Sequence, residues 1–458
     1  MPSSGFLRSY HVVALCAIAL LSLGLVMVTS AGMELASPAK AADSAPLRAA
    51  QDPSVSAATP PASKASSPTS IPPLAPAREM SLRDMLLTTN GAFMAISLLA
   101  MAAAAMLPVR LLARKAQPAM LIAGGRGQIL EDRWAGIRTL AVGCAFLLGL
   151  LLLVYLAGLG KSVKGAERWL RVPVPGLGLV SVQPSEIAKW TMVGLIAWYA
   201  TRRAAILHTF WLGLTPALIG IGAVAALIVK EDLGTGVLIG AAASLVLIAA
   251  GARFWHFLLL SPIAAAAIAA AVATSAYRVR RITAFLDPYA DPRETGYHMI
   301  QSMGAISSGG LFGKGLGNGV QKFGYLPEDT NDFIFAIICE ELGAPGALIV
   351  IGLFILLLWA AWGIVSRERN RLLQLFGMGI LATIGLQALI NLTVVTAMGP
   401  TKGIALPLVS AGGTGWTLTA FCLGIVIAIG RTQERLATSD IHRPAMSDWA
   451  RRSPEPAA

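Results

Sequence analysis

The chain has 458 residues, of which 55% are hydrophobic and 13% are charged, and its mean hydropathy is +0.68. Soluble domains carry about 25% charged residues, so this composition excludes an ordinary soluble enzyme and indicates an integral membrane protein. A net charge of +12 would suggest a nucleic-acid partner in a soluble protein. Here arginine-rich cytoplasmic loops and anionic lipid explain the charge, so we expect membrane lipid and no nucleic acid among the partners.

Long apolar segments recur along the chain. A helix that crosses a bilayer needs about 20 mostly apolar residues, and the sequence contains about ten such segments. They lie near residues 11–33, 86–108, 136–158, 184–202, 207–229, 233–251, 255–276, 332–365, 373–398 and 409–430. We therefore predict an all-α integral membrane fold. The cysteines within these segments are predicted to be small hydrophobic residues, not disulfides or metal ligands; they are Cys16, Cys144, Cys339 and Cys422.

The N-terminal segment, residues 1–34, is compatible with two interpretations. It has a basic residue, an apolar core and small residues before AKAADSA, as in a signal peptide. Its apolar run is long for a signal core, which favours a retained first transmembrane helix. Either way residues 35–80 start outside, and their Ala, Pro and Ser content predicts a disordered external loop.

The distribution of arginine predicts the orientation of the helices. RLLARK, RGQILEDR, TRRA, SRERNR and RTQER fall on one side, which the positive-inside tendency assigns to the cytoplasm together with the tail 432–458. The opposite side is also basic, with Lys161, Lys164, Arg168, Arg171, Lys230, Arg278, Arg280, Arg281, Arg293, Lys314, Lys322 and Lys402. Any one of these could be a solvated loop charge, but together they indicate an external site for an anionic ligand.

The largest external loop, residues 277–331, precedes the eighth predicted span, and Asp332 lies where the two meet. The loop mixes aromatic residues, glycines and Asp-Pro turns, which argues for function and against disorder. Asp332 could be the N-cap of the following helix, or a general base that accepts a hydroxyl proton at the membrane surface. Glu340 and Glu341 lie about two helical turns deeper, and we predict structural pairing for them because ionisable residues within a span face an interior partner.

A second polar group is predicted around QPSEIAKW. Glu186 and Lys189 are spaced i, i+3 and therefore share a helix face. Asp232 in KEDLGTG and Arg83 in SLRDML fall on the same outer side of the membrane. These four side chains are predicted to form a cluster that either lines a cavity or locks helices together.

Two glycine-rich segments also lie on the outer side. GLFGKGLGNG has the composition of a phosphate loop, but no strand precedes it, so we do not predict a nucleotide site. Its glycines would let the chain approach the bilayer surface or a ligand closely. GPTKGIALPLVSAGGTGW interrupts a helical pattern at the outer mouth, where irregular backbone is tolerated if it lines protein or a water-filled cavity. These patterns alone leave a transporter and a membrane-embedded transferase comparable.

Four motifs resemble, in order and spacing, those of the SEDS family (shape, elongation, division and sporulation). They are GAERWL…QPSEIAKW, DLGTGVLI, RRITAFLDPYADPRETGYHMIQSMGAISSGGLFGKGLGNGVQKFGYLPEDTNDFIFAIICEELGAPGAL and GPTKGIALPLVSAGGTGW. The resemblance implies a transmembrane domain over residues 81–431. It also implies an activity, that of a peptidoglycan glycosyltransferase. Such an enzyme polymerises lipid II, a disaccharide-pentapeptide on undecaprenyl diphosphate, at the outer face of the cytoplasmic (inner) membrane.

The resemblance implies that Asp332 is the catalytic acid at the end of the external loop. It would remove the proton of the GlcNAc 4-hydroxyl of the acceptor, whose oxygen attacks the anomeric carbon of the donor while undecaprenyl diphosphate leaves. External cations would stabilise that leaving group. The residues predicted to bind substrate or support the site are Lys189, Glu186, Asp232, Arg83, Arg281, Lys314, Lys322, Lys402 and Ser410. A divalent cation, Mg or Mn, could also bind at the diphosphate, although no carboxylate cluster demands one.

The sequence departs from the family pattern near the site. The run from Pro327 to Asp332 lacks the usual histidine, and its extra acid, Asp329, is a second candidate base. SAGG at 410–413 stands where the family usually has SYGG, which removes a tyrosine. A scaffold without catalysis therefore stays open. A lipid II flippase would need a continuous polar path, which the clustering of charge in the outer half disfavours.

The branch and the partners are also implied by the resemblance. GVQKFGYLPE favours the division-type branch, FtsW, and leaves the elongation-type branch, RodA, open. The implied partners are a class B penicillin-binding protein, which cross-links the glycan, and other division proteins. The predicted location is the cytoplasmic membrane, with the site facing outside.

Overall fold

The computed structural model describes residues 8–32, 88–116, 126–155, 160–163, 166–174, 178–321, 330–411 and 413–441. Several predicted features lie outside these residues, namely the external loop 35–80, most of the C-terminal tail, Arg83, Lys322 and Asp329.

Every predicted span coincides with a helix. In chain order these helices are α1 (Ser9–Ala31), α4 (Thr89–Met106), α6 (Arg126–Leu152), α7 (Pro184–Arg202), α8 (Thr215–Glu231), α9 (Leu233–Ala249), α10 (Phe254–Ala273), α13 (Ile334–Val365), α14 (Arg371–Val395) and α15 (Gly413–Ile441). In the described part of the chain, seven helical segments are long and apolar enough to cross a membrane, and Gly136–Leu152 and Leu233–Ala249 are shorter apolar helices. The chain is a multi-pass membrane protein.

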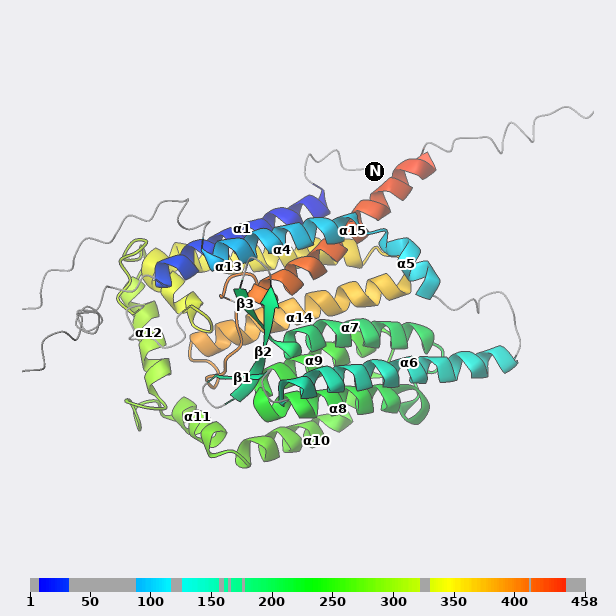
Figure 1. Cartoon of the computed structure of the whole chain (residues 1–458), viewed down its shortest axis with the longest axis horizontal. Helices are drawn as coiled ribbons and strands as arrows, with labels where there is room; N and C mark the ends of the chain where they lie inside the picture. The colour runs from blue at the N-terminus through cyan, green and yellow to red at the C-terminus, as the bar shows by residue number, and fades with distance from the viewer. Residues whose placement is uncertain are drawn as a thin grey trace, which may run out of the picture.

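The long helices lie side by side along one direction, and shorter helices lie at the ends of the bundle (Figure 1). The predicted external loop contains two of them, α11 (Ala276–Leu286) and α12 (Tyr297–Gly309), at the left-hand end in Figure 1. At the opposite end lies α5 (Val109–Ala116). A π-helical turn, Phe210–Leu214, leads into α8. The predicted external loop 277–331 therefore contains two helices, in agreement with a composition that argued against disorder.

The buried apolar residues form two groups. One joins α1, α13, α14 and α15, and the other joins α6, α7, α8 and α9. Helix α14 contacts members of both groups and holds the two halves together. By contrast α10 has no buried residue, although it is strongly apolar. Its side chains are suited to bilayer lipid, because the hydrocarbon core is as apolar as they are.

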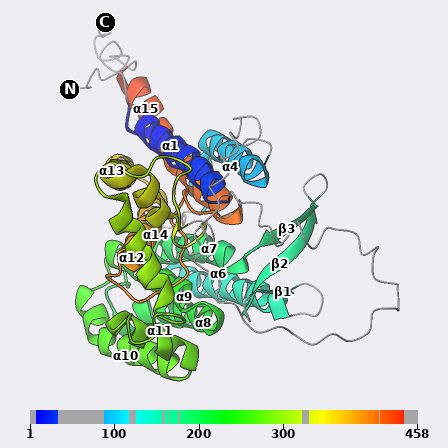
Figure 2. The same cartoon turned by 90° about the vertical axis from the view of Figure 1, so that its left-hand side faces the viewer.

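An addition to the predicted all-α fold is a small antiparallel sheet between α6 and α7, visible on the right of Figure 2. Its strands are β1 (Gly160–Val163), β2 (Ala166–Val174) and β3 (Gly178–Val182), in the order β1-β2-β3. Leu170 of β2 pairs with Val182 of β3. The aromatic and β-branched residues of this segment favour strands. The sheet delivers the chain directly to the first turn of α7.

The acidic pair in α13 has a structural role, as predicted. Helix α13 is interrupted at Gly343, where φ is +65°. Both Glu340 and Glu341 are fully buried just before this break. Lys314 Nζ donates to Glu340 Oε1 at 2.6 Å, and Ser30 Oγ of α1 donates to Glu341 Oε2 at 2.8 Å. The two carboxylates thus fix the glycine-rich segment that follows α12 against α13.

Candidate active site

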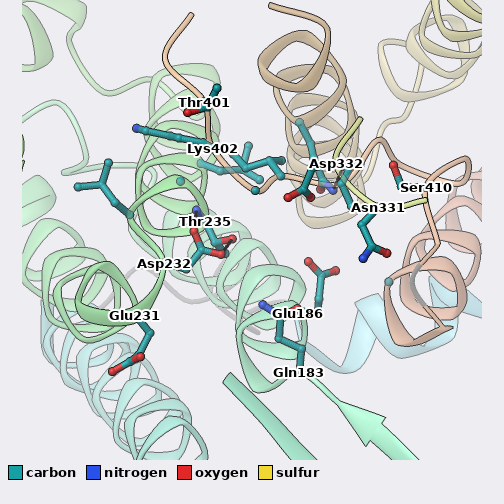
Figure 3. A pocket seen from close by; sticks show the side chains of 18 of the residues that line it. Gln183, Glu186, Glu231, Asp232, Thr235, Asn331, Asp332, Thr401, Lys402 and Ser410 are labelled. Atoms are coloured by element: carbon teal, nitrogen blue, oxygen red, sulfur yellow. Dashed lines mark hydrogen bonds between the residues drawn. The ribbon is translucent and has the colours of Figure 1, made fainter. Parts of the chain in front are cut away.

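A cavity of about 1310 Å³ lies at the end of the bundle that carries the sheet, α11 and α12. Its walls come from the first turn of α7, the α8–α9 junction, α11, residues 331–333, the segment 400–411 and the start of α15. Figure 3 shows that carboxylates and amides from several of these segments surround one open space. Groups far apart in sequence therefore meet here, which is typical of a ligand site between helices.

Asp332 lines the cavity immediately before α13. The predicted N-cap alternative does not hold, because Phe333 occupies the N-cap position of α13. The carboxylate lies against the backbone of the segment 400–411, since a Cβ atom on Gly403 would lie 2.7 Å from Asp332 Oδ2. The carbonyl of Asp332 accepts a hydrogen bond of 2.8 Å from Asn391 Nδ2 on α14. The backbone of Asp332 is therefore held by α14, and its carboxylate lies close to Gly403.

Glu186 enters the cavity from the first turn of α7 (Figure 3). It pairs with Lys189, with 2.8 Å between Nζ and Oε2, and the Lys189 side chain is only 1% exposed. Lys189 Nζ also donates to Gln387 Oε1 at 2.8 Å. The predicted i, i+3 pair thus exists, with the glutamate facing the cavity and the lysine behind it.

Asp232 lies at the junction where α8 ends and α9 begins, and it lines the same cavity. It is the N-cap of α9, with Thr235 N donating to Oδ1 at 3.1 Å and Thr235 Oγ1 to Oδ2 at 2.8 Å. A carboxylate satisfies the free amides at a helix N-terminus in this way. The Asp232 side chain therefore marks the boundary between α8 and α9 and contributes negative charge to the cavity.

Four basic side chains line the cavity, namely Lys230, Arg278, Arg281 and Lys402. Arg278 donates to the carbonyls of Val229 and Lys230, which fixes α11 to the end of α8. Arg281 donates to the Thr401 carbonyl at 3.0 Å. Burial and the positive charge of Arg278 and Arg281 lower the pKa of Lys402, and Asp232 opposes this only in part. An anionic ligand beside Lys402 would favour the charged form of this lysine.

The structure brings together most, but not all, of the predicted site residues. Asp332, Glu186, Asp232, Arg281, Lys402 and Ser410 line the cavity. Lys189 lies behind Glu186, and Lys314 pairs with Glu340 in the glycine-rich segment. Ser410 closes a turn, since its Oγ accepts from Leu406 N at 2.7 Å.

Some cavity residues were not predicted from the sequence. His298 of α12 lines the cavity and stacks on Phe333, with 5.9 Å between ring centroids. Gln387 of α14 also lines it, and Asn391 lies one turn further along the same helix. Polar residues within an apolar span normally face the bundle interior, so the i, i+4 spacing of these two amides was a signal that could have identified them.

Comparison with known proteins decides the family. Residues 78–435 match the cell cycle protein family of FtsW, RodA and SpoVE. This chain belongs to that family. A probable peptidoglycan glycosyltransferase FtsW of Thioalkalivibrio sulfidiphilus is 40% identical over 303 residues, which are 65% of this chain and 74% of that protein. Stage V sporulation protein E of Bacillus subtilis is 38% identical over 296 residues, 64% of this chain and 78% of that protein.

Solved structures agree on the fold of this FtsW/RodA/SpoVE family member. The rod shape determining protein RodA of Thermus thermophilus aligns with a TM-score of 0.51 at 21% identity, over 92% of this chain and 95% of that one. A chain from a structure described as "Structural coordination of polymerization and crosslinking by a peptidoglycan synthase complex" aligns with a TM-score of 0.52 at 24% identity. That alignment covers 75% of this chain and 95% of the other.

Proposed function

We propose that this chain is a peptidoglycan glycosyltransferase of the FtsW type, which polymerises lipid II at the outer face of the cytoplasmic membrane for septal division. Relatives about 40% identical carry the name probable peptidoglycan glycosyltransferase FtsW. The observation that carries the proposal is the cavity itself, which is lined by the carboxylate of Asp332 together with the cations Arg281 and Lys402. Transfer of a sugar from a diphosphate needs a base and a site for the leaving anion, and the cavity offers both.

In the proposed reaction Asp332 takes the proton of the GlcNAc 4-hydroxyl of an acceptor lipid II. The oxygen forms a bond to the anomeric carbon of the terminal MurNAc of the donor, and the bond from that carbon to undecaprenyl diphosphate breaks. Gly403 touches the Asp332 carboxylate, and Lys402 is its neighbour in the chain. The base and the cation can therefore lie close to the same anomeric carbon, with the nucleophile beside one and the leaving group beside the other.

Charge on the leaving diphosphate would be stabilised by Lys402, Arg281 and Arg278, with no reorganisation at the moment of reaction. Two of these cations are already fixed by backbone carbonyls. Within the described ranges, no three His, Cys, Asp or Glu side chains form a group that could hold a metal ion. A Mg or Mn ion bound with the diphosphate needs only one or two protein carboxylates, so it remains part of the proposal, and no step of the mechanism is derived through it.

The proposal includes partners. One similar chain comes from a peptidoglycan synthase complex described for its structural coordination of polymerisation and cross-linking. We propose that the present chain likewise acts with a class B penicillin-binding protein, which would cross-link the glycan that this chain makes. Division proteins would bring the pair to the septum.

The test is polymerisation of labelled lipid II by purified protein, with its transpeptidase partner, comparing wild type with Asp332→Asn. We expect long glycan from wild type and a fall of about 10²- to 10⁴-fold in the variant, with equal lipid II binding. Equal glycan from both would reject Asp332 as the base and direct attention to Asp329. Absence of glycan from wild type would favour a scaffold, or a flippase if lipid II crosses vesicle membranes instead.

A further inference from the structure

Two side-chain amides on one face of α14 hold the segment 400–411 in place. Gln387 Nε2 donates to the Ala405 carbonyl at 2.8 Å, and Asn391 Nδ2 donates to the Ile404 carbonyl at 2.7 Å. Gln387 and Asn391 are spaced i, i+4, so they lie one above the other on the helix. They are 7% and 1% exposed, respectively. We refer to this pair as the amide clamp.

The orientation of both amides follows from their partners. Asn391 Nδ2 is shared by two carbonyl oxygens, those of Ile404 and Asp332, and an amide oxygen could not bond to either. Gln387 accepts from Lys189 Nζ with one atom and donates to Ala405 with the other. The clamp therefore connects the Glu186–Lys189 pair to the segment 400–411, and that segment to the backbone of Asp332.

The clamped segment has a backbone that needs external support. Leu408 within it has φ of +63°, and Ala397 just before it has φ of +57°. Non-glycine residues adopt this region at a cost, and they persist there when surrounding contacts determine the conformation. Asn391 Oδ1 is buried and makes no hydrogen bond in the described part of the chain, which is a further cost. The orientation of the Asn391 side chain thus provides the two donor contacts of Nδ2 and leaves Oδ1 without a donor.

The clamp also determines the position of the reacting carboxylate. Gly403, which lies against Asp332 Oδ2, is followed directly by Ile404 and Ala405, whose carbonyls the clamp holds. Loss of the Asn391 amide would therefore release the backbone of Asp332 and the adjacent backbone of Ile404 together. A displacement of about 1 Å at a reacting group can cost about 10²-fold in rate.

We propose that Gln387 and Asn391 are positioning residues that hold Asp332 and the segment 400–411 in the geometry for proton transfer. This inference rests on the proposed function, because it assumes that Asp332 is the base. Neither side chain takes part in the chemistry. The expected signature is a loss of turnover with little change in the KM for lipid II, because Arg278 and Arg281 lie on α11, outside the segment that the clamp holds.

The test compares turnover and KM for lipid II in wild type, Asn391→Ala and Asn391→Asp, the last of which keeps the shape but loses the donor. The matched control is Thr383→Val on the same helix, because Thr383 is fully buried and donates to Gly379 O of its own helix. We expect both Asn391 variants to lose about 10- to 100-fold in kcat, with KM within about threefold of wild type. Hydrogen exchange of the amides of 331–333 and 401–406 should rise in both, and the control should match wild type.

The inference is overturned if Asp332→Asn is inactive while the Asn391 variants keep wild-type kcat. It is also overturned if activity falls only in proportion to the number of lipid II-binding sites, with amide exchange unchanged, since that marks a purely structural role. If Asn391→Ala does not fold, Gln387→Glu replaces it, because this change keeps the acceptor for Lys189 and removes the donor to Ala405. Full activity in Asp332→Asn would instead reject the proposed function.

Discussion

Two groups of acidic residues lie at the same end of the bundle, and they differ in what surrounds them. Glu340 and Glu341 are fully buried and accept hydrogen bonds from a lysine, a serine and backbone amides. Asp332 and Glu186 face a large cavity. An acid enclosed by donors cannot exchange its proton without breaking the local structure, whereas an acid that faces a cavity can. The surroundings of an acidic residue, more than its type, therefore determine whether it stabilises the structure or can take part in proton transfer.

Apart from replacement of Asp332 itself, the largest effect is expected from a substitution that crowds the Asp332 carboxylate. Gly403→Ala would place a methyl group 2.7 Å from Asp332 Oδ2, so the carboxylate must move. We expect kcat for lipid II polymerisation to fall by about 10- to 100-fold, with thermal stability close to that of wild type. Gly399→Ala is a matched control, because a Cβ atom there has no contact shorter than 3.7 Å. Full activity in Gly403→Ala would show that the position of this carboxylate is not limiting.

A smaller effect is expected from changes at Lys402, one of the cations that line the cavity. Lys402 has a pKa below its ordinary value of 10.5, mainly because of burial. Its charged form is thus less favoured in the folded protein, and affinity for the diphosphate of lipid II should begin to fall at a pH below 10.5. We expect Lys402→Gln to weaken lipid II binding about tenfold at neutral pH. Lys402→Arg should remove the alkaline loss, because a guanidinium stays protonated.

The lowered pKa of Lys402 also makes the stability of the folded protein depend on pH. Because the folded pKa is lower than the unfolded one, protonation of this lysine destabilises the free protein as pH falls through the interval between the two values. A bound anion should reverse this loss of stability, because it favours the protonated lysine. The predicted loss of affinity at alkaline pH is checked by binding curves for lipid II from neutral to alkaline pH. Identical alkaline profiles for wild type and Lys402→Arg would contradict it.

The smallest effect on chemistry is expected at the structural acids. Glu340→Ala removes the acceptor of Lys314 Nζ and of the amides of Val320 and Gln321. A buried donor left without an acceptor costs about 1–3 kcal/mol. These three donors are part-buried, so water replaces the acceptor for some of them, and we expect a loss of about 2–4 kcal/mol in stability. Activity per folded molecule should stay close to that of wild type. Thermal unfolding in detergent and glycan yield per lipid II-binding site measure the two quantities separately, and a large loss of yield at unchanged stability would contradict the structural role.

The sequence predicted the helices well, because each apolar span is long enough to be recognised by length alone. It also predicted the pairing of Glu186 with Lys189, which follows from helix geometry. The sheet was missed because two of its three strands, β1 and β3, have only four and five residues. The partner of Lys314 could not be predicted, because the path of the glycine-rich segment back onto α13 depends on tertiary contacts. The roles of Gln387 and Asn391 likewise become visible only once α14 and the segment 400–411 are side by side.

The central claim is that the acid facing the cavity performs the chemistry while the enclosed acids hold the structure. The most direct test measures lipid II polymerisation by Asp332→Asn and Glu340→Ala side by side, each expressed per folded, lipid II-binding molecule. We predict that Asp332→Asn binds lipid II and makes glycan about 10²- to 10⁴-fold more slowly than wild type, whereas the folded fraction of Glu340→Ala makes glycan at nearly the wild-type rate. The account is contradicted if Asp332→Asn polymerises normally, or if folded Glu340→Ala binds lipid II and makes none.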